Sequence, residues 1–279
     1  MKFLQKPLPF VKMSGTGNDF ILIDHRQPRI VPELMSEFAR LVCRRRFSVG
    51  ADGLILIEDS DQADFQWRFF NGDGSVAEMC GNGARCAARF AYMQGIAPAH
   101  MRFLTLAGII EAKVADTNVA VRMTPPRDFQ LNRRVTLTEG AVLLHSVDTG
   151  VPHAVLFVDD CEGVDVCGLG REIRFHRDFM PAGTNVNFVQ LLENGVLKVR
   201  TYERGVENET LACGTGATAA ALLAAVLGRG SSPAEVITSG GDRLTISFDL
   251  REGPAAANVF LKGPAHIIYS GDLTAEALL

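Results

Sequence analysis

The sequence has little that would favour binding to nucleic acid or insertion into a membrane. Its 279 residues carry a formal net charge of −4, and residues 44–46 form the only run of cationic side chains, so nucleic acid is not an expected partner. Lys6, Pro7 and Pro9 interrupt the first ten residues, which lack the continuous apolar centre of a signal peptide. The longest uncharged helical stretch, residues 217–227, is too short to cross a bilayer. We therefore expect a cytoplasmic protein without a membrane partner.

Metal-binding patterns are also missing. The six cysteines and six histidines form no Cys-x-x-Cys, His-x-x-x-His or His-x-x-Glu-His pattern, so no metal and no other cofactor is expected. In a reducing compartment the cysteines should be thiols. We expect four of them to be small core residues, namely Cys43, Cys86, Cys161 and Cys167.

The remaining two cysteines lie in nearly identical local sequences. Cys80-Gly-Asn-Gly-Ala84 and Cys213-Gly-Thr-Gly-Ala217 each open an alanine-rich stretch that reads as a helix. A thiol at a helix N-terminus meets unpaired backbone N–H groups and the positive end of the helix dipole, which favour the thiolate. Two such thiols suggest an acid and a base.

The two cysteine motifs belong to a longer internal repeat. Cys213 follows Cys80 by 133 positions. The same offset relates four pairs of glycines, each beside an apolar run: Gly17 and Gly150, Gly50 and Gly183, Gly95 and Gly228, and Gly108 and Gly241. Landmarks that keep one order and one offset indicate duplicated domains.

The repeat predicts two lobes of similar fold. With 279 residues the chain exceeds the usual size of a single core. Prolines at 125 and 126 interrupt any helix or central strand and mark a linker at residues 123–128. We expect an N-terminal lobe over residues 1–126, a C-terminal lobe over 127–264, and a C-terminal strand over 265–279 that returns to the N-terminal lobe.

Each lobe is expected to be mostly strand, an α+β arrangement in which a curled sheet or barrel wraps around one apolar helix. Short β-branched or alternating runs bounded by turn residues predict strands at residues 20–23, 54–57, 65–70, 109–114 and 119–123, and again at 154–158, 187–190, 197–202 and 244–248. A peripheral polar helix is expected at residues 32–46. The helix that follows each cysteine is almost wholly apolar and should be buried on most faces.

The duplicated site suggests a definite chemistry. Glycines in each Gly-x-Gly should let the backbone turn tightly and leave N–H groups open as a small anion site. Two facing helix N-termini would hold one carboxylate between them, with a sulfur on either side. One sulfur can then remove the α-proton while the other returns a proton to the opposite face, as a cofactor-free racemase requires.

Polar residues near the two cysteines add possible substrate contacts. Glu203 and Arg204 end a predicted strand and offer an acceptor for an ammonium and a fork for a carboxylate, although an exposed ion pair is the alternative. His153 is either a core histidine or a secondary proton-handling group.

The chain resembles the diaminopimelate epimerase family over nearly its whole length. The motifs that carry the resemblance are Lys12-Met-Ser-Gly-Thr-Gly-Asn-Asp-Phe20, Gly50-Ala-Asp-Gly53, Phe70-Asn-Gly-Asp-Gly-Ser75, the two cysteine motifs, Thr184-Asn-Val-Asn-Phe188 and Glu203-Arg-Gly205. The resemblance implies interconversion of LL- and meso-2,6-diaminopimelate in lysine and peptidoglycan precursor synthesis, without pyridoxal phosphate or metal. It also implies a homodimer, with Tyr269 near the C-terminal strand.

The resemblance further implies roles for individual residues. Cys80 and Cys213 would be base and acid, exchanging roles with the direction of reaction. The reacting carboxylate would be held by Gly81, Asn82, Gly214 and Thr215. The rest of the substrate would be held by Asn18, Gly53, Asn71, Asn185, Glu203 and Arg204. His153 and Glu203 would tune the reacting groups.

The chain departs from the family pattern at three places. Val151 stands where asparagine is frequent, and Gly53 where many members have glutamine, so two side-chain contacts to the distal end of the substrate are missing. The segment 205–210 is one residue longer than the commonest form. The first two departures bear on substrate choice, the third bears on the loop before Cys213, and all three leave the two-thiol chemistry intact.

Other functions remain open from the residues alone. One alternative is a two-thiol racemase for another amino acid, such as proline, hydroxyproline or histidine. From a different class, two activated thiols that face one cleft could form a redox switch. An isomerase of another kind, or a binding pair of lobes without catalysis, would need neither thiol.

Overall fold

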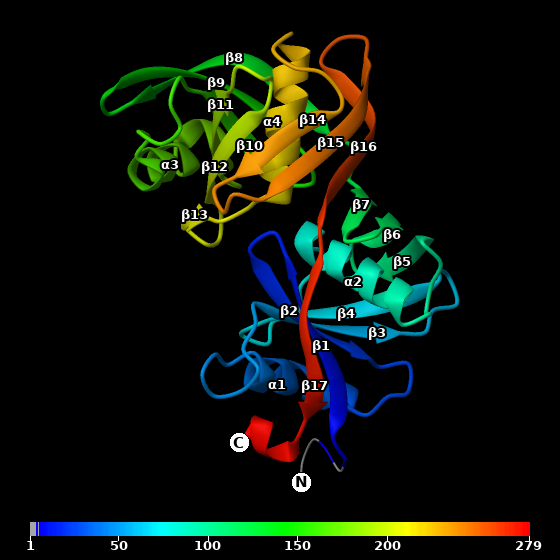
Figure 1. The fold of residues 1–279 in the computed structure, drawn as a ribbon. Coiled ribbons are helices and arrows are strands. Elements are labelled where there is room, and N and C mark those ends of the chain that lie inside the picture. The colour runs from blue at the N-terminus through cyan, green and yellow to red at the C-terminus, as the bar shows by residue number, and fades with distance from the viewer. Residues whose placement is uncertain (1–3, 5) are drawn as a thin grey trace. The chain divides into compact units, whose positions relative to one another are not determined.

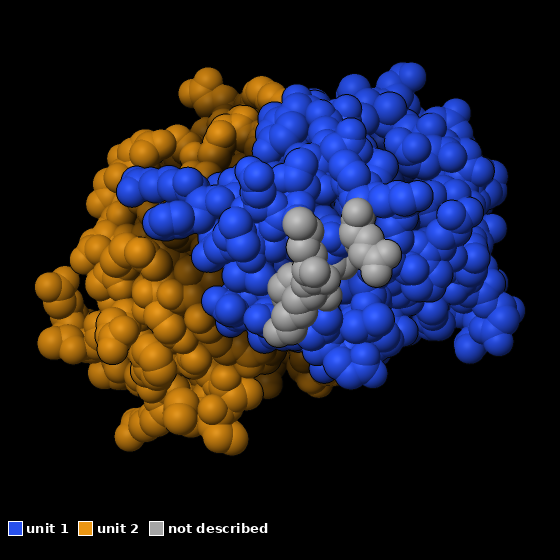
Figure 2. All heavy atoms as spheres, turned by 90° about the horizontal axis from the view of Figure 1, so that it is seen from below, with its two compact units in different colours: residues 1–121, 263–279 blue, residues 122–262 orange. Residues whose placement is uncertain are grey.

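A computed structural model describes residue 4 and residues 6–279. Residues 1–3 and 5, part of the stretch considered above for a signal peptide, lie outside the described residues. The chain divides into two compact units, unit 1 (Met1–Val121 and Gly263–Leu279) and unit 2 (Arg122–Lys262), which are blue and orange in Figure 2. The sequence placed the lobe borders at residues 126 and 264, and the units of the structure end at residues 121 and 262.

Unit 1 is a mixed sheet with two helices. Along the chain β1 and β2 pair antiparallel, β2 and β3 parallel, β3 and β4 antiparallel, and β4 and β5 parallel. Antiparallel pairs β5–β6 and β6–β7 follow, and β17 pairs antiparallel with β1. The elements are β1 (Leu8–Gly15), β2 (Asn18–Asp24), α1 (Pro32–Val42), β3 (Gly53–Glu58), β4 (Phe65–Asn71), α2 (Gly81–Met93), β5 (His100–Thr105), β6 (Gly108–Ala115), β7 (Asn118–Arg122), β17 (His266–Leu273) and the 3-10 helix η2 (Ala275–Leu278).

Unit 2 repeats this order of pairings. Strands β9 and β10 pair antiparallel, β10 and β11 parallel, β11 and β12 antiparallel, and β12 and β14 parallel. The antiparallel pairs β14–β15 and β15–β16 follow. Strand β8 pairs antiparallel with β9, as β17 does with β1. The elements are β8 (Arg127–Leu137), β9 (Gly140–Asp148), β10 (Pro152–Phe157), α3 (Val166–Arg174), the 3-10 helix η1 (Arg177–Phe179), β11 (Asn185–Leu191), β12 (Leu197–Glu203), β13 (Asn208–Thr210), α4 (Gly214–Val226), β14 (Ala234–Thr238), β15 (Arg243–Arg251) and β16 (Ala255–Pro264).

The predicted repeat therefore corresponds to a repeated topology. Helices α2 and α4 have 13 residues each, and both ends of α4 follow those of α2 by the same 133 positions that separate the cysteines. The glycine pairs of the repeat lie in turns and have positive φ, for example 68° at Gly95 and 71° at Gly228. Side chains rarely adopt this backbone conformation, which explains why glycine recurs there.

Each unit encloses one helix in its curled sheet. In Figure 1 the strands of unit 2 surround α4, which contacts β9, β10, β11, β12, β14 and β15. Its run of alanines is buried from Ala217 to Ala225, and small side chains let the strands approach on several sides. Helix α2 has the same place in unit 1 and contacts β1, β2, β3 and β6. The predicted mixed fold with a curled sheet around a central helix is confirmed.

Several local predictions need correction. Helix α1 ends at Val42 and not at residue 46; its C-cap is Cys43, and Arg46 has a φ of 72° that a helix cannot continue. Helix α1 is also amphipathic, because one face with Met35 and Phe38 is buried. Among the four cysteines expected in the core, Cys167 is exposed near the start of α3.

The sequence patterns left several strands unassigned, both paired strands within the sheet, such as β1 and β14, and more exposed ones, such as β8 and β17. Strand β17 is exposed over most of its length, and β8 alternates exposed polar residues with half-buried or buried ones. The two prolines of the predicted linker lie between β7, which ends at Arg122, and β8, which begins at Arg127. Within the described residues, none of the helices has the length and apolarity that a membrane span needs.

Candidate active site

Cys80 occupies the N-cap position of α2, directly before the first helical residue, Gly81. Its backbone is extended, with φ −146° and ψ 122°, and its carbonyl accepts the first helical hydrogen bond, from the N–H of Ala84 at 2.8 Å. The cysteine side chain makes no capping hydrogen bond to the first turn. The first N–H groups of a helix have no acceptor within the helix, so they are available as donors beside this thiol.

Cys213 has the same position in unit 2. It caps α4 with φ −126° and ψ 108°, its side chain makes no capping hydrogen bond, and its carbonyl accepts from the N–H of Ala217 at 2.9 Å. The Sγ atom lies 3.4 Å from the Oγ1 of Thr215, the second helical residue. Each unit thus presents one thiol together with the donor end of its central helix.

The glycines of the two cysteine motifs do not form the tight turn that the sequence suggested; what they provide is room for neighbouring atoms. All four belong to helices, and none has a positive φ. A Cβ on Gly216 would lie 2.2 Å from the Oδ1 of Asn187 and 3.3 Å from the Sγ of Cys213. Among the described residues, no atom lies within 4 Å of the Cβ position of Gly81. A side chain at position 81 would therefore meet no other described residue beyond its chain neighbours and the backbone of its own helix.

A chain of charge-oriented hydrogen bonds starts inside the first turn of α2. The Nη2 of Arg85 donates to Asn82 Oδ1 at 2.8 Å, and Asn82 Nδ2 donates to Asn18 Oδ1 at 2.8 Å. Asn18 Nδ2 then donates to a carboxylate oxygen of Asp52 at 2.9 Å, and Arg45 donates to the other oxygen at 2.9 Å. A guanidinium at one end and a carboxylate at the other fix the orientation of both amides. Two predicted site residues, Asn18 and Asn82, are thereby brought into contact.

Arg85 is the residue of this network that the sequence interpretation missed. It is fully buried, and it also donates to the carbonyls of Gly81 and Pro264. A cation buried in the central helix stands out from the apolar residues around it, because burial of a charge is costly unless it is well hydrogen-bonded. Its place in the cysteine motif was the available signal.

Gly53 and Asn71 lie directly opposite each other in the β3–β4 pair. A Cβ on Gly53 would be 2.7 Å from the carbonyl oxygen of Phe70 and 2.7 Å from Cε2 of Phe69. No side chain fits there, so Gly53 can offer a ligand its backbone only. Asn71 is exposed at the end of β4, and its amide donates to Ser75 Oγ at 3.0 Å.

In unit 2, Asn185 ties together the ends of two strands. Its Nδ2 donates to the carbonyl of Pro152 at 3.0 Å, and its Oδ1 accepts from the backbone N–H of Arg204 at 2.9 Å. The guanidinium of Arg204 donates to the carbonyl of Ala182 at 3.1 Å. Burial raises the pKa of Glu203, the last residue of β12. The carboxyl group of Glu203 and the guanidinium group of Arg204 thus belong to consecutive residues at the end of β12.

His153 lies in a buried polar group behind α4. Its Nδ1 is 3.1 Å from Asn187 Nδ2, which also donates to the carbonyl of Ala154 at 2.9 Å, while Thr201 donates to Asn187 Oδ1 at 3.0 Å. Complete burial lowers the pKa of His153 to about 3, so the ring is neutral at neutral pH. Its Nε2 is buried and has no hydrogen-bond partner among the described residues.

Asn187 is the second site residue that sequence interpretation missed. It is fully buried, and it contacts both His153 and the helix position of Gly216. An asparagine at a central position of an apolar strand run was its signal, since buried amides need specific partners.

The other thiols differ from the two cap cysteines in their surroundings. Burial raises the pKa of Cys43 and of Cys86 to about 12 and that of Cys161 to about 11, so these three are protonated at neutral pH. Cys167 is exposed, and its Sγ lies 3.1 Å from Asn208 Oδ1. Within the part of the chain that the structure describes, no three His, Cys, Asp or Glu side chains are grouped as a metal site.

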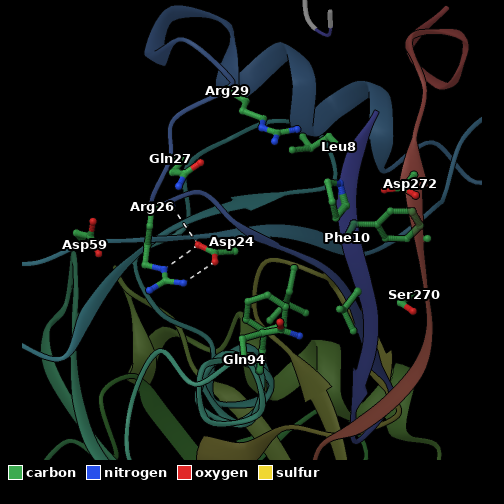
Figure 3. A pocket seen from close by; sticks show the side chains of 15 residues that line it. Leu8, Phe10, Asp24, Arg26, Gln27, Arg29, Asp59, Gln94, Ser270 and Asp272 are labelled. Atoms are coloured by element: carbon green, nitrogen blue, oxygen red, sulfur yellow. Dashed lines mark hydrogen bonds and ion pairs between the residues drawn. The ribbon is translucent and has the colours of Figure 1, made fainter. Parts of the chain in front are cut away.

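Unit 1 also contains a separate hollow of about 780 Å³ (Figure 3). It is lined by β1, β2, β17 and the end of α2, and none of the predicted site residues lines it. Arg26 donates to both carboxylate oxygens of Asp24, at 2.9 and 2.8 Å, so the charges nearest each other in Figure 3 are already paired.

Known proteins match the chain over nearly its full length. The family profile described as diaminopimelate epimerase matches residues 10–128 and 145–267. A curated protein named diaminopimelate epimerase from Aquifex aeolicus is 48% identical, with 97% of this chain and 99% of that protein covered. One of the same name from Chlorobaculum tepidum is 44% identical, with 94% and 100% covered.

Solved structures with low sequence identity share the fold. A PhzF-family phenazine biosynthesis protein from Bacillus anthracis has a TM-score of 0.74 at 16% identity, covering 97% of this chain and 100% of that one. A hydroxyproline epimerase from Agrobacterium vitis has a TM-score of 0.68 at 15% identity, covering 99% and 94%.

The repeated units, each with a cysteine at the start of its central helix, and the full-length relatives define an enzyme of the isomerase class. The chain belongs to the diaminopimelate epimerase family, which confirms the resemblance seen in the sequence motifs.

Burial of His153 predicts a specific dependence of stability on pH. In the unfolded chain this histidine takes up a proton near pH 6.5, whereas the buried ring does so only near pH 3. Its contribution to stability is therefore complete above pH 6.5 and is lost as the pH falls from 6.5 toward 3. We expect the urea-unfolding free energy of the variant His153→Phe to fall less steeply than that of the wild type in this window.

The matched control is His266→Phe, which removes an exposed histidine. This control should keep the slope of the wild type. Equal slopes for the wild type and His153→Phe would contradict the neutral buried ring.

Proposed function

We propose that this protein interconverts LL- and meso-2,6-diaminopimelate with its two cap thiols and without a cofactor. The observation that carries the proposal is the equivalent placement of Cys80 and Cys213 at the N-terminus of the central helix of each unit. The full-length relatives with 48% and 44% identity support the substrate.

In the proposed reaction the substrate's reacting α-carbon is held between the two sulfurs. One cysteine thiolate takes the α-proton, and the electron pair of the broken C–H bond moves onto the α-carboxylate. The other cysteine thiol then gives its proton to the opposite face of that carbon, which inverts the centre. Reaction in the reverse direction exchanges the two roles.

The helix termini supply the stabilisation that this step needs. An α-carbanion is unstable unless the charge that moves onto the carboxylate is met by fixed donors. The N–H groups of Gly81, Asn82, Gly214 and Thr215 are in the first turns of α2 and α4, where no helical acceptor exists for them. We propose that they bind the reacting carboxylate and hold its developing charge.

The distal amino acid centre is assigned to the polar strand ends. Arg204 would bind the distal carboxylate, Glu203 the distal ammonium, and Asn18, Asn71 and Asn185 would complete the contacts. Gly53 would contribute its backbone only, because a side chain at that position would collide with Phe70. His153 and Glu203 would tune the site, with His153 acting as a neutral ring.

The first test uses the two cap cysteines. We expect Cys80→Ala and Cys213→Ala to reduce epimerisation of LL-diaminopimelate below detection, because each removes an obligatory proton carrier. The matched control is Cys167→Ala, which removes an exposed thiol outside the two motifs and should retain wild-type turnover. Full turnover by either cap-cysteine variant would refute the two-thiol mechanism.

Exchange of the α-proton with D2O, followed in substrate and product together, decides the substrate. Wild-type protein should exchange the α-proton of LL-diaminopimelate and leave proline and glutamate unchanged. Exchange of proline with inert diaminopimelate would instead indicate a racemase of a different amino acid. If the protein with both thiols reduced exchanged the α-proton of none of these substrates, the proposed enzymatic activity would be contradicted.

We further propose a homodimer located in the cytoplasm. Strand β17 leaves Ile268 and Tyr269 exposed, and exposed apolar residues on a strand are typical of an interface. The six cysteines are thiols in the structure, which suits a reducing compartment. Light scattering of the purified protein should give twice the chain mass of 30.2 kDa, and a monomer at micromolar concentration would contradict the dimer.

A further inference from the structure

Two threonines lie at equivalent positions of the repeat, next to the helix that each cysteine opens. Thr16 and Thr149 differ by 133 positions, like the cysteines, and both are almost fully buried. Thr16 lies between β1 and β2, and Thr149 lies between β9 and β10. Neither belongs to the residues discussed so far as acid, base or substrate contact.

Both threonine hydroxyls contact the second helical residue after the cysteine. Thr16 Oγ1 lies 2.9 Å from Asn82 Oδ1 and also accepts a hydrogen bond from Arg85. Thr149 Oγ1 donates to the carbonyl of Thr215 at 3.1 Å. Asn82 and Thr215 are themselves related by the repeat offset. In both units, therefore, the threonine between the first two strands of the repeat contacts the second residue of the central helix. In unit 1 the contact is to the side chain of that residue, and in unit 2 it is to the backbone carbonyl.

The backbone of Thr16 has a conformation that a threonine rarely adopts. Its φ is 54°, a left-handed conformation in which a β-branched residue is uncommon, and Gly17 follows with φ 87°. Two-residue hairpin turns of this kind favour asparagine or glycine. A threonine that is kept in an unfavourable conformation points to a use for its hydroxyl.

We infer that Thr16 and Thr149 are positioning residues that fix the first turns of α2 and α4, each for the cysteine of its own unit. This inference rests on the proposed function, because the N–H groups of these turns are those assigned to the reacting carboxylate. A turn that is free to shift would misplace both the donors and the thiol, and small misplacements in a reacting site reduce rates strongly.

The substitution that tests this removes the hydroxyl and keeps the shape. In Thr16→Val and Thr149→Val we expect kcat to fall by about 10- to 100-fold with a smaller change in KM, because the donors act mainly on the developing charge. Thr16→Ser and Thr149→Ser, which restore a hydroxyl, should recover most of the rate. The measurement is the initial rate of epimerisation of LL-diaminopimelate over a range of substrate concentrations up to saturation, which gives kcat and KM separately.

The repeat offers a matched pair of controls. Thr105 and Thr238 are also 133 positions apart and nearly buried, and their hydroxyls donate to the carbonyls of Gly108 and Asp242 within their own turns. Thr105→Val and Thr238→Val lose a comparable hydrogen bond away from the cysteine motifs. They should keep wild-type kcat, and thermal unfolding of all variants measures any general loss of stability.

A second readout does not depend on turnover. The rate of alkylation by iodoacetamide is followed against pH for each cysteine by mass spectrometry, with exposed Cys167 as internal reference. Thr16→Val should shift the pH profile of Cys80 and leave that of Cys213 unchanged, and Thr149→Val should do the reverse. A general loosening of the fold would move both cysteines together.

The outcomes separate the inference from the function on which it rests. Valine variants that match the Thr105 and Thr238 controls in kcat and in alkylation would overturn the inference while the epimerase proposal stands. Wild-type protein without epimerase activity would end the proposed function, and unit-specific alkylation shifts would still support the positioning role.

Discussion

The structure depends on one local constraint, the start of a helix at a cysteine. A helix always begins with N–H groups that have no acceptor of their own, and here the cap side chain does not take them in either unit. Glycine follows each cysteine, so the first helical residue places no side chain of its own beside these donors. A thiol beside open, positively polarised donors is suited to exchange protons next to a carboxylate. The surrounding strands serve to bury the rest of the helix and to hold this end in place.

The duplication places the N-termini of α2 and α4 at equivalent positions of the two units, but the residues around these two helix ends differ. Strand order, helix length and the turn glycines repeat between the units. The fifth helical residue reaches back to the first helical carbonyl in both, as Arg85 in unit 1 and as Thr218 in unit 2. Unit 1 therefore carries a buried cation in its helix where unit 2 has a neutral hydroxyl. Unit 2 has instead the neutral His153 and the raised pKa of Glu203 near β12. The two thiols therefore have equivalent positions in the repeat and unlike surroundings.

The sequence predicted features that depend on local pattern, and it missed those that depend on tertiary contact. The starts of the two central helices and the repeat offset follow from short motifs and were found. Strand β17 has no buried face to give alternation, and α1 ends at Val42 with Cys43 as its C-cap, a boundary that residue propensity does not indicate. Arg85 and Asn187 were missed because their role comes from partners distant in the chain. Gly53 was interpreted as a lost contact, and only packing against Phe70 shows that no side chain fits.

The most direct test of two sulfurs acting on opposite faces is the early distribution of deuterium. Reduced protein is mixed with LL-diaminopimelate in D2O, and substrate and product are separated during the first few per cent of reaction, then in the reverse direction from the meso form. Two monoprotic thiols on opposite faces predict deuterium in the product and almost none in the remaining substrate, in both directions. Equal early labelling of substrate and product would show a single base and would contradict the account.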